Sequence, residues 1–141
     1  MNFLACDLGG TKTLLGIFKQ DCDSIAPKLI LQKKYISSQW CSFDLILEDF
    51  LKKECKGFSY PVSACFAVAG PIKNNTSKIM NLSWNISCDE LKNKFNFKSC
   101  ELLNDFASQI YGIPFLKENQ YATLQKGQQT NSANSNLHAI V

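Results

Sequence analysis

The feature that most constrains the fold is a tight turn near the amino terminus, Asp-Leu-Gly-Gly-Thr-Lys at residues 7–12. One apolar run precedes it at residues 3–5, and another follows at residues 14–18. Both runs are too short for a helix and have the length of buried strands. A Gly-Gly pair between two such runs predicts a β-hairpin with positive φ angles at Gly9 and Gly10.

The same turn carries the groups that a nucleoside triphosphate needs. The two glycines are expected to leave backbone N–H groups bare for an oxyanion, and Thr11 and Lys12 add a hydroxyl and an ammonium. Asp7 is a candidate ligand for Mg²⁺, directly or through water. The pattern is also that of an ordinary hairpin with a polar tip. The G-x-x-x-x-G-K-[ST] loop does not occur, and a strand pattern after the glycines excludes a dinucleotide fingerprint.

The composition is that of one globular domain. The 141 residues are 45% hydrophobic and 19% charged, and a chain of this length buries about two-thirds of its unfolded surface. The net charge of +3 is too small to predict nucleic-acid binding. No apolar run approaches the ~18 residues of a membrane span, and no secretory signal is recognisable. We therefore expect a cytoplasmic protein without nucleic-acid or membrane partners.

Cysteine and histidine usage does not predict a metal site. The seven cysteines are scattered without a C-x-x-C pair, and His138 is the single histidine, so zinc is not expected. Cys65, for example, lies inside an apolar run. Several cysteines lie in such runs, and these are interpreted as small buried hydrophobic residues in a reducing cytoplasm.

The rest of the chain alternates strand and helix patterns. Further strands are expected at residues 29–35, 62–68, 77–82, 99–103, 121–126 and 137–141. Helices are expected at residues 43–54, 88–95 and 106–114. Residues 127–136 are expected to form a mobile polar loop. Three strands in a row, followed by a strand–helix–strand unit, predict an α/β domain. Its sheet is expected to be mixed, to begin with an antiparallel three-stranded meander, and to be flanked by helices.

Several single residues indicate where these helices begin and end, and which segments are buried. Ser42 or Asp44 can begin the first helix and Gly57 can end it. Ser87 and Glu90 have the spacing of a capping box. The near-continuous apolar run at residues 62–68 is typical of a strand covered on both faces of a sheet. Trp84 is interpreted as a core residue.

Two stretches follow strands at the sheet edge where ligands bind in open α/β folds. Ala69-Gly70-Pro71 comes directly after the strand at residues 62–68 and is either a plain connecting turn or part of a ligand site. Asn104 and Asp105 lie where a strand passes into a helix. Either residue suits a helix N-cap. Asp105 could also face a bound hydroxyl while Asn104 hydrogen-bonds to a polyol, and both interpretations can hold together.

These motifs together resemble the amino-terminal part of bacterial-type glucokinases, in the superfamily of sugar kinases, Hsp70 and actin. The resemblance rests on five stretches that follow the family's order up to about Leu116, at residues 6–12, 67–71, 81–87, 102–108 and 111–114. The first is shared by the superfamily, whereas Asn-Asp-Phe and Trp-x-Ile-Ser are more specific to glucokinases. The resemblance implies a ribonuclease H-like (actin-like ATPase) domain.

The resemblance also implies a function, namely ATP-dependent phosphorylation of glucose at its 6-hydroxyl with Mg²⁺. Gly9, Gly10 and Thr11 would lie in the first phosphate-binding hairpin, and Asp7 would help to place magnesium. Asp105 would be the catalytic base, and both Asp105 and Asn104 would bind the sugar. A homodimer like those of the family is compatible with the resemblance, although the residues do not derive one.

The chain departs from the family pattern at residues 137–141. In the family a similar strand leads into a second glycine-rich phosphate loop, further sugar-binding acid and histidine residues, and a larger domain that holds adenosine. We therefore expect residues 1–141 to be the amino-terminal (small) domain of a glucokinase-like sugar kinase, truncated at its carboxyl end, without the large domain and inactive alone.

Two other functions stay open. One is a different hexose or N-acetyl sugar kinase of the same superfamily, which shares the first hairpin but matches less well at residues 104–106. The other is a non-catalytic α/β module that binds a partner or uses a missing half of the protein in trans.

Overall fold

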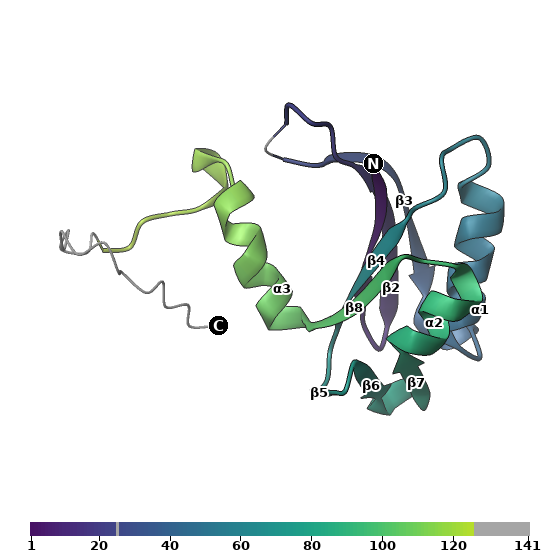
Figure 1. Ribbon diagram of the computed structural model, residues 1–141. Coiled ribbons are helices and arrows are strands. Elements are labelled where there is room, and N and C mark those ends of the chain that lie inside the picture. Colours follow the sequence, from purple (N-terminus) through teal and green to yellow (C-terminus); the bar gives the residue numbers. More distant parts are fainter. Residues whose placement is uncertain (25, 126–141) are drawn as a thin grey trace. The chain divides into compact units, whose positions relative to one another are not determined.

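The computed structural model describes residues 1–24 and 26–125 (Figure 1). The strand expected at residues 137–141, the polar loop expected at residues 127–136, and His138 lie outside them. The chain divides into two compact units, Met1–Asp105 and a second unit that begins at Phe106.

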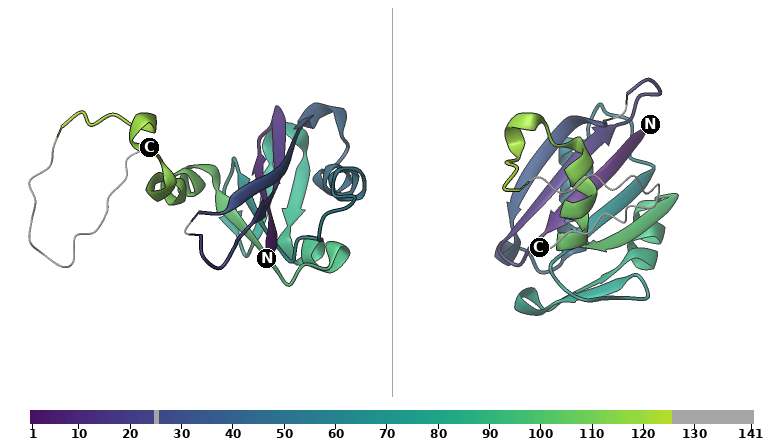
Figure 2. Two further views of the ribbon diagram at one scale, coloured as in Figure 1. Left: turned by 90° about the horizontal axis from the view of Figure 1, so that it is seen from above. Right: turned by 90° about the vertical axis from the view of Figure 1, so that its left-hand side faces the viewer.

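A five-stranded mixed sheet is the framework of the first unit, and its strands lie side by side in the order β3-β2-β1-β4-β8 (Figure 2). The strands are β1 (Asn2–Leu8), β2 (Lys12–Lys19), β3 (Lys28–Ile36), β4 (Ser63–Val68) and β8 (Ser99–Asn104). The first three form an antiparallel meander, whereas β4 is parallel to both β1 and β8. The mixed sheet with helices that the sequence predicts is present.

Helices α1 and α2 pack on one face of this sheet (Figure 1). They are α1 (Phe43–Asp49), which continues as the π-helical turn η2 (Phe50–Glu54), and α2 (Cys88–Phe95). Ser42 occupies the N-cap position of α1 without a capping hydrogen bond from its side chain. Ser87 caps α2 as predicted, because its Oγ accepts a hydrogen bond from Glu90 N–H at 3.4 Å. Gly57 follows η2 with a φ of 87°, a conformation that glycine adopts readily.

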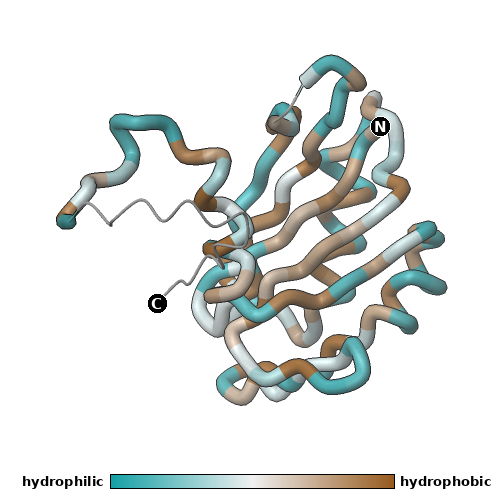
Figure 3. Tube along the Cα trace, turned by 60° about the vertical axis from the view of Figure 1, so that its left-hand side comes forward, coloured by the Kyte–Doolittle hydropathy of each residue, from teal (hydrophilic) through white to brown (hydrophobic). Residues whose placement is uncertain are grey.

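The hydrophobic core lies between these helices and the sheet. Leu4, Phe66 and Ile46 are fully buried, and each such side chain contributes about 1.5–3 kcal/mol on burial. Phe43 of α1 meets Phe66 of β4 edge to face, with ring centroids 5.2 Å apart. The central strands are hydrophobic for much of their length (Figure 3). Packing of α1 against β4 thus holds the centre of the sheet.

Burial alternates along β4 rather than running through it as the apolar sequence predicts. Ala64, Phe66 and Val68 are buried, whereas Cys65 and Ala67 are half-buried. Successive side chains of a strand point to opposite faces, and α1 and α2 pack on one of those faces. The prediction of a strand covered on both faces is therefore confirmed for one face, while the face with Cys65 and Ala67 is half-buried in the described residues.

All seven cysteines are free thiols, and most of them are buried or half-buried. Burial is confirmed for four of them, Cys6, Cys55, Cys88 and Cys100, while Cys65 is half-buried and Cys22 and Cys41 are exposed. Cys22 and Cys41 lie outside the apolar runs to which the interpretation applies, and Cys65 within its run is only half-buried.

A second, three-stranded sheet that the sequence analysis did not predict lies beyond the end of the larger sheet where β1 and β4 end (Figure 1). Its strands are β5 (Ile72–Lys73), β6 (Thr76–Ile79) and β7 (Trp84–Ser87). Asn74 and Asn75 connect β5 to β6 with φ angles of 50° and 54°, as in a type I′ turn. The strand predicted at residues 77–82 ends at Ile79, because η3 (Met80–Leu82) is a 3-10 turn. Trp84 is buried, which confirms it as a core residue.

Helix α3 (Asp105–Gly112) leads into the second unit, which also contains the 3-10 turns η4 (Ile113–Phe115) and η5 (Glu118–Gln120). The helix predicted at residues 106–114, with Gly112 and Pro114 marking its end, is therefore present and ends at Gly112. Residues 121–125 form no strand, so the strand predicted at residues 121–126 is wrong in its described part. No helix among the described residues has the length and apolar character needed to cross a bilayer.

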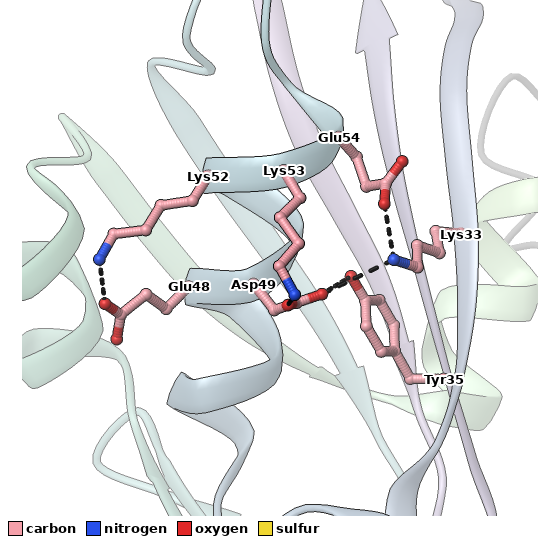
Figure 4. Close-up of polar contacts among 7 residues, drawn as sticks. All are labelled: Lys33, Tyr35, Glu48, Asp49, Lys52, Lys53 and Glu54. Carbon is pink, nitrogen blue, oxygen red and sulfur yellow. Dashed lines mark hydrogen bonds and ion pairs between the residues drawn. The ribbon is translucent and has the colours of Figure 1, made fainter.

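A polar network joins α1 and η2 to β3 (Figure 4). The Tyr35 hydroxyl donates to Asp49 Oδ2 at 3.1 Å, and Lys53 Nζ lies 2.5 Å from Asp49 Oδ1. Lys33 Nζ lies 3.6 Å from Asp49 Oδ2 and 2.6 Å from Glu54 Oε1. Hydrogen bonds from Lys53 and from Tyr35 lower the pKa of Asp49, whereas burial raises the pKa of Tyr35 and keeps it a donor.

Replacing Asp49 with Asn is expected to lower the free energy of unfolding by about 1 kcal/mol at pH 7, because a charged acceptor is lost. The folded-state pKa of Asp49 lies below its unfolded value of about 4. The stabilisation is therefore full above that value and disappears as the pH falls through the folded-state pKa. Urea unfolding of both proteins from pH 7 downward measures the difference, which should shrink toward zero.

Glu48→Gln is the matched control, since Glu48 is the neighbouring carboxylate and pairs with Lys52 on the outer side of α1. It should change stability less than Asp49→Asn. A gap between wild type and Asp49→Asn that stays constant as the pH falls would contradict the assignment.

Candidate active site

The carboxyl ends of β1, β4 and β8 reach the same edge of the larger sheet. In the parallel ladders Leu8 of β1 pairs with Val68 of β4, and Val68 pairs with Asn104 of β8. These three residues lie in one row, with β1 and β8 about 10 Å apart at the usual strand spacing. Gly9 after β1 and Asp105 after β8 therefore leave the sheet at the same edge.

The predicted hairpin between β1 and β2 is present, but the structural reason for glycine in its turn differs from the predicted one. Their predicted positive φ is wrong, because Gly57 is the glycine with positive φ in residues 1–24 and 26–125. The Gly9 N–H donates to Lys12 O at 3.0 Å. A Cβ at Gly9 would lie 3.0 Å from the same oxygen. Close approach of two backbone segments, rather than a left-handed conformation, therefore requires glycine here.

The tip of the hairpin still presents donors. The prediction of bare N–H groups is wrong for Gly9, whose N–H is hydrogen-bonded within the turn. In the described part of the chain, no hydrogen bond engages the N–H of Gly10 or Thr11. The side chains of Thr11 and Lys12 are exposed. Asn81 of η3 borders the tip, with its Nδ2 3.5 Å from the position that a Cβ of Gly10 would take. The tip thus offers N–H, hydroxyl and ammonium donors to an anion.

Ser37 holds this hairpin from the inside, a contact that the sequence analysis missed. It is the first residue of η1 (Ser37–Gln39) and is fully buried. Its Oγ donates to Gly9 O at 2.8 Å and lies 3.0 Å from Thr13 Oγ1. Its N–H donates to Thr11 O at 3.0 Å. No local signal marks Ser37, because it is 28 residues from Gly9 along the chain.

Asp7 is exposed near the carboxyl end of β1, two residues before Gly9. Burial raises the pKa of the adjacent Cys6, so that residue is a neutral thiol. In the described ranges, no three His, Cys, Asp or Glu side chains gather to hold a metal ion. A Mg²⁺ ion at Asp7 would thus take its other ligands from phosphate oxygens and water, which is a usual arrangement for Mg²⁺.

Asn104 and Asp105 lie at the end of β8, where α3 begins. Both side chains are half-buried. Asn104 Nδ2 donates to Gly70 O at 3.5 Å, so the turn after β4 contacts the end of β8. Asn104 occupies the position before the first helical residue, where an N-cap stands. Its role as a cap and its role as a sugar ligand both stay predictions, as does the role of Asp105 as a base.

The comparison with known proteins identifies the family. The family model Glucokinase matches residues 4–140. The chain belongs to the glucokinase family. Among its glucokinase relatives, that of Nostoc punctiforme is 38% identical over 124 residues, or 88% of this chain, and that of Synechocystis is 34% identical over 131 residues, or 89%. The chain spans 36% and 37% of the length of these two glucokinases.

Solved glucokinases also share the fold of this family member. The crystal structure of glucokinase from an Antarctic psychrotroph matches with a TM-score of 0.80 and 30% identity, over 92% of this chain and 40% of the other. A ROK family glucokinase from Streptomyces griseus, in complex with glucose and AMPPNP, matches with a TM-score of 0.57 over 79% of this chain and 36% of the other. At 14% identity the second likeness concerns the fold alone. The resemblance found in the sequence is confirmed at the level of the family.

Gly9→Ala is expected to lower the free energy of unfolding by about 1–3 kcal/mol, because overpacking against the Lys12 backbone oxygen forces the turn to shift. Gly10→Ala is the matched control: a Cβ there meets the Asn81 side chain at 3.5 and 3.6 Å, which are ordinary contacts. Its effect should stay within about 0.5 kcal/mol. Urea unfolding measures both variants, and equal losses would rule out the close-approach explanation.

Proposed function

We propose that this chain forms the amino-terminal domain of a kinase that transfers the γ-phosphoryl group of ATP to the 6-hydroxyl of glucose. Membership of the glucokinase family supports the reaction. The observation that carries it in the structure is the row Leu8–Val68–Asn104, since it brings the hairpin tip and Asp105 to one edge. The solved Streptomyces griseus relative in complex with glucose and AMPPNP supports this pair of substrates.

The proposed fold class is ribonuclease H-like, as in actin-like ATPases. The mixed sheet with an antiparallel meander followed by parallel strands supports this class. So does the likeness in fold to ROK family glucokinase. Four buried free cysteines support a reducing compartment, and we place the protein in the cytoplasm.

In the proposed reaction the hairpin binds the phosphates of ATP. The N–H groups of Gly10 and Thr11 donate to phosphate oxygens, and the Thr11 hydroxyl and the Lys12 ammonium add further donors. Gly9 allows the close turn that supports them. Asp7 helps to hold Mg²⁺, which neutralises charge on the phosphates when it is bound. Positioning and charge stabilisation of this kind account for most of the catalysis of phosphoryl transfer.

The second half of the site binds the sugar. Asn104 hydrogen-bonds to a hydroxyl of glucose, and Asp105 orients the 6-hydroxyl toward the γ-phosphorus. As the oxygen of that hydroxyl bonds to phosphorus, the bond to the bridging oxygen of ADP breaks and the hydroxyl proton passes to the Asp105 carboxylate. Asp105 lies at the same sheet edge as the hairpin, which is the placement that this transfer needs.

We further propose that this chain supplies one part of each substrate site. It spans only about a third of the length of its glucokinase relatives, and the adenosine-binding part of the enzyme is expected in the remainder. The 141-residue chain alone should therefore show no phosphorylation of glucose in a coupled assay for ADP. A chimera that continues it with the remaining length of Nostoc punctiforme glucokinase should be active, with glucose preferred over N-acetyl sugars.

Asp105→Asn in that chimera is expected to lower kcat by about 10²–10⁴-fold, the usual contribution of a general base. Glucose binding, measured by calorimetry, should be largely kept, because the amide retains the shape of the carboxylate. Glu101→Gln is the matched control, as it removes an exposed carboxylate from the same strand. Unchanged turnover in Asp105→Asn would show that this residue is not the base. A folded but inactive parent chimera would contradict the proposed function itself.

A further inference from the structure

We propose that Ser37 is a positioning residue for the phosphate-binding hairpin. The proposal rests on the function above, because it concerns how the tip at Gly10 and Thr11 is held ready for phosphate. Ser37 contacts neither tip N–H group itself. It acts through the carbonyl groups of the turn.

The hydrogen bonds around Ser37 have a defined direction. A serine hydroxyl has one proton, and here it is donated to Gly9 O at 2.8 Å. The 3.0 Å contact between the Ser37 and Thr13 hydroxyls is therefore donated by Thr13. The Ser37 N–H donates to Thr11 O at 3.0 Å. One residue after β3 thus binds the carbonyl groups on both sides of Gly10.

The bond to Gly9 O sets the direction of one donor at the tip, the Gly10 N–H. In a trans peptide the C=O of one residue and the N–H of the next point in opposite directions. Because the Gly9 carbonyl is turned toward the buried Ser37, the Gly10 N–H is turned away from it. An anion bound by this N–H would meet a donor whose direction is set by contacts within the protein, so less ordering would be needed on binding.

The burial of Ser37 and Thr13 means that a side chain without a hydroxyl cannot replace Ser37 at no cost. Ser37 and Thr13 are both fully buried. Alanine at position 37 would leave the Gly9 carbonyl and the Thr13 hydroxyl without their partner, and such buried groups are costly to leave unpaired. The Gly9 carbonyl would then be free to rotate toward another donor, and the Gly10 N–H would rotate with it.

The test compares three variants of the 141-residue chain by NMR of the Gly10 and Thr11 amides. Ser37→Ala removes the proposed contact. Ser77→Ala is the matched control, since Ser77 is buried and its Oγ has no hydrogen-bond partner in the described part of the chain. Thr13→Val removes the hydroxyl that donates to Ser37 but leaves the hydrogen bond from Ser37 to Gly9. It therefore shows whether loss of stability alone, without loss of the bond to Gly9, changes the tip.

Two readouts are measured on each variant while urea unfolding shows it to be folded. In Ser37→Ala, the NMR order parameter of the Gly10 N–H should fall. MgATP titration of the Gly10 and Thr11 amides, in the 141-residue chain or in the chimera above, should show about tenfold weaker binding. In Ser77→Ala and Thr13→Val both readouts should stay within about twofold of wild type. If Ser37→Ala does not fold, Ser37→Cys takes its place, since a thiol fills the space but donates weakly.

The outcomes separate this proposal from the function on which it rests. If the wild-type amides respond to MgATP neither in the 141-residue chain nor in the chimera, the phosphate site is wrong, while the order parameter of the Gly10 N–H still tests the role of Ser37. If Ser37→Ala loses stability but keeps the wild-type order parameter of the Gly10 N–H and the wild-type MgATP affinity, Ser37 is a packing residue and the proposal is overturned. The same holds if Thr13→Val weakens MgATP binding as much as Ser37→Ala.

Discussion

The register of β1 is the constraint on which the rest of the structure depends. β1 pairs antiparallel with β2 on one edge and parallel with β4 on the other. Leu4 and Leu8 are fully buried, and a shift by one residue would turn both toward the opposite face. Core packing therefore specifies the register strongly. The same register determines that the hairpin tip and the ends of β4 and β8 meet at one edge, so the candidate site is a consequence of how the core is packed.

Local patterns were sufficient to predict most of this framework. The first hairpin, β3, α1 and α2 follow from periodicity, from the capping residue Ser87 and from the helix-ending Gly57. The small sheet was missed because β5 has two residues and β7 has four, too few to show a period. Its available signal was the pair Asn74–Asn75, since asparagine tolerates the left-handed conformation that a type I′ turn needs. Ser37 could not be found locally, because its partners belong to a distant part of the chain.

The small sheet matters to the site because it supports β8, the last strand of the larger sheet in the described residues. Asn75 Nδ2 donates to Cys100 O at 3.1 Å, and Asn75 Oδ1 accepts from Leu102 N–H at 3.0 Å. One amide side chain thus pairs with the edge of β8 as a neighbouring strand would. The segment it supports runs directly to Asn104 and Asp105. The unpredicted sheet therefore stabilises the strand that carries the proposed sugar-binding residues.

The difference between a left-handed turn and a closely packed one changes what the glycines do for binding. A turn that needed positive φ at Gly9 and Gly10 would be specified by their own backbone preferences. The observed turn is specified by contacts instead: the Gly9 N–H is bonded to Lys12 O, and its carbonyl is bonded to Ser37. Glycine provides the space for these contacts. Since these contacts lie within the protein, the Gly10 N–H is oriented for an anion by the fold around the motif rather than by the motif alone.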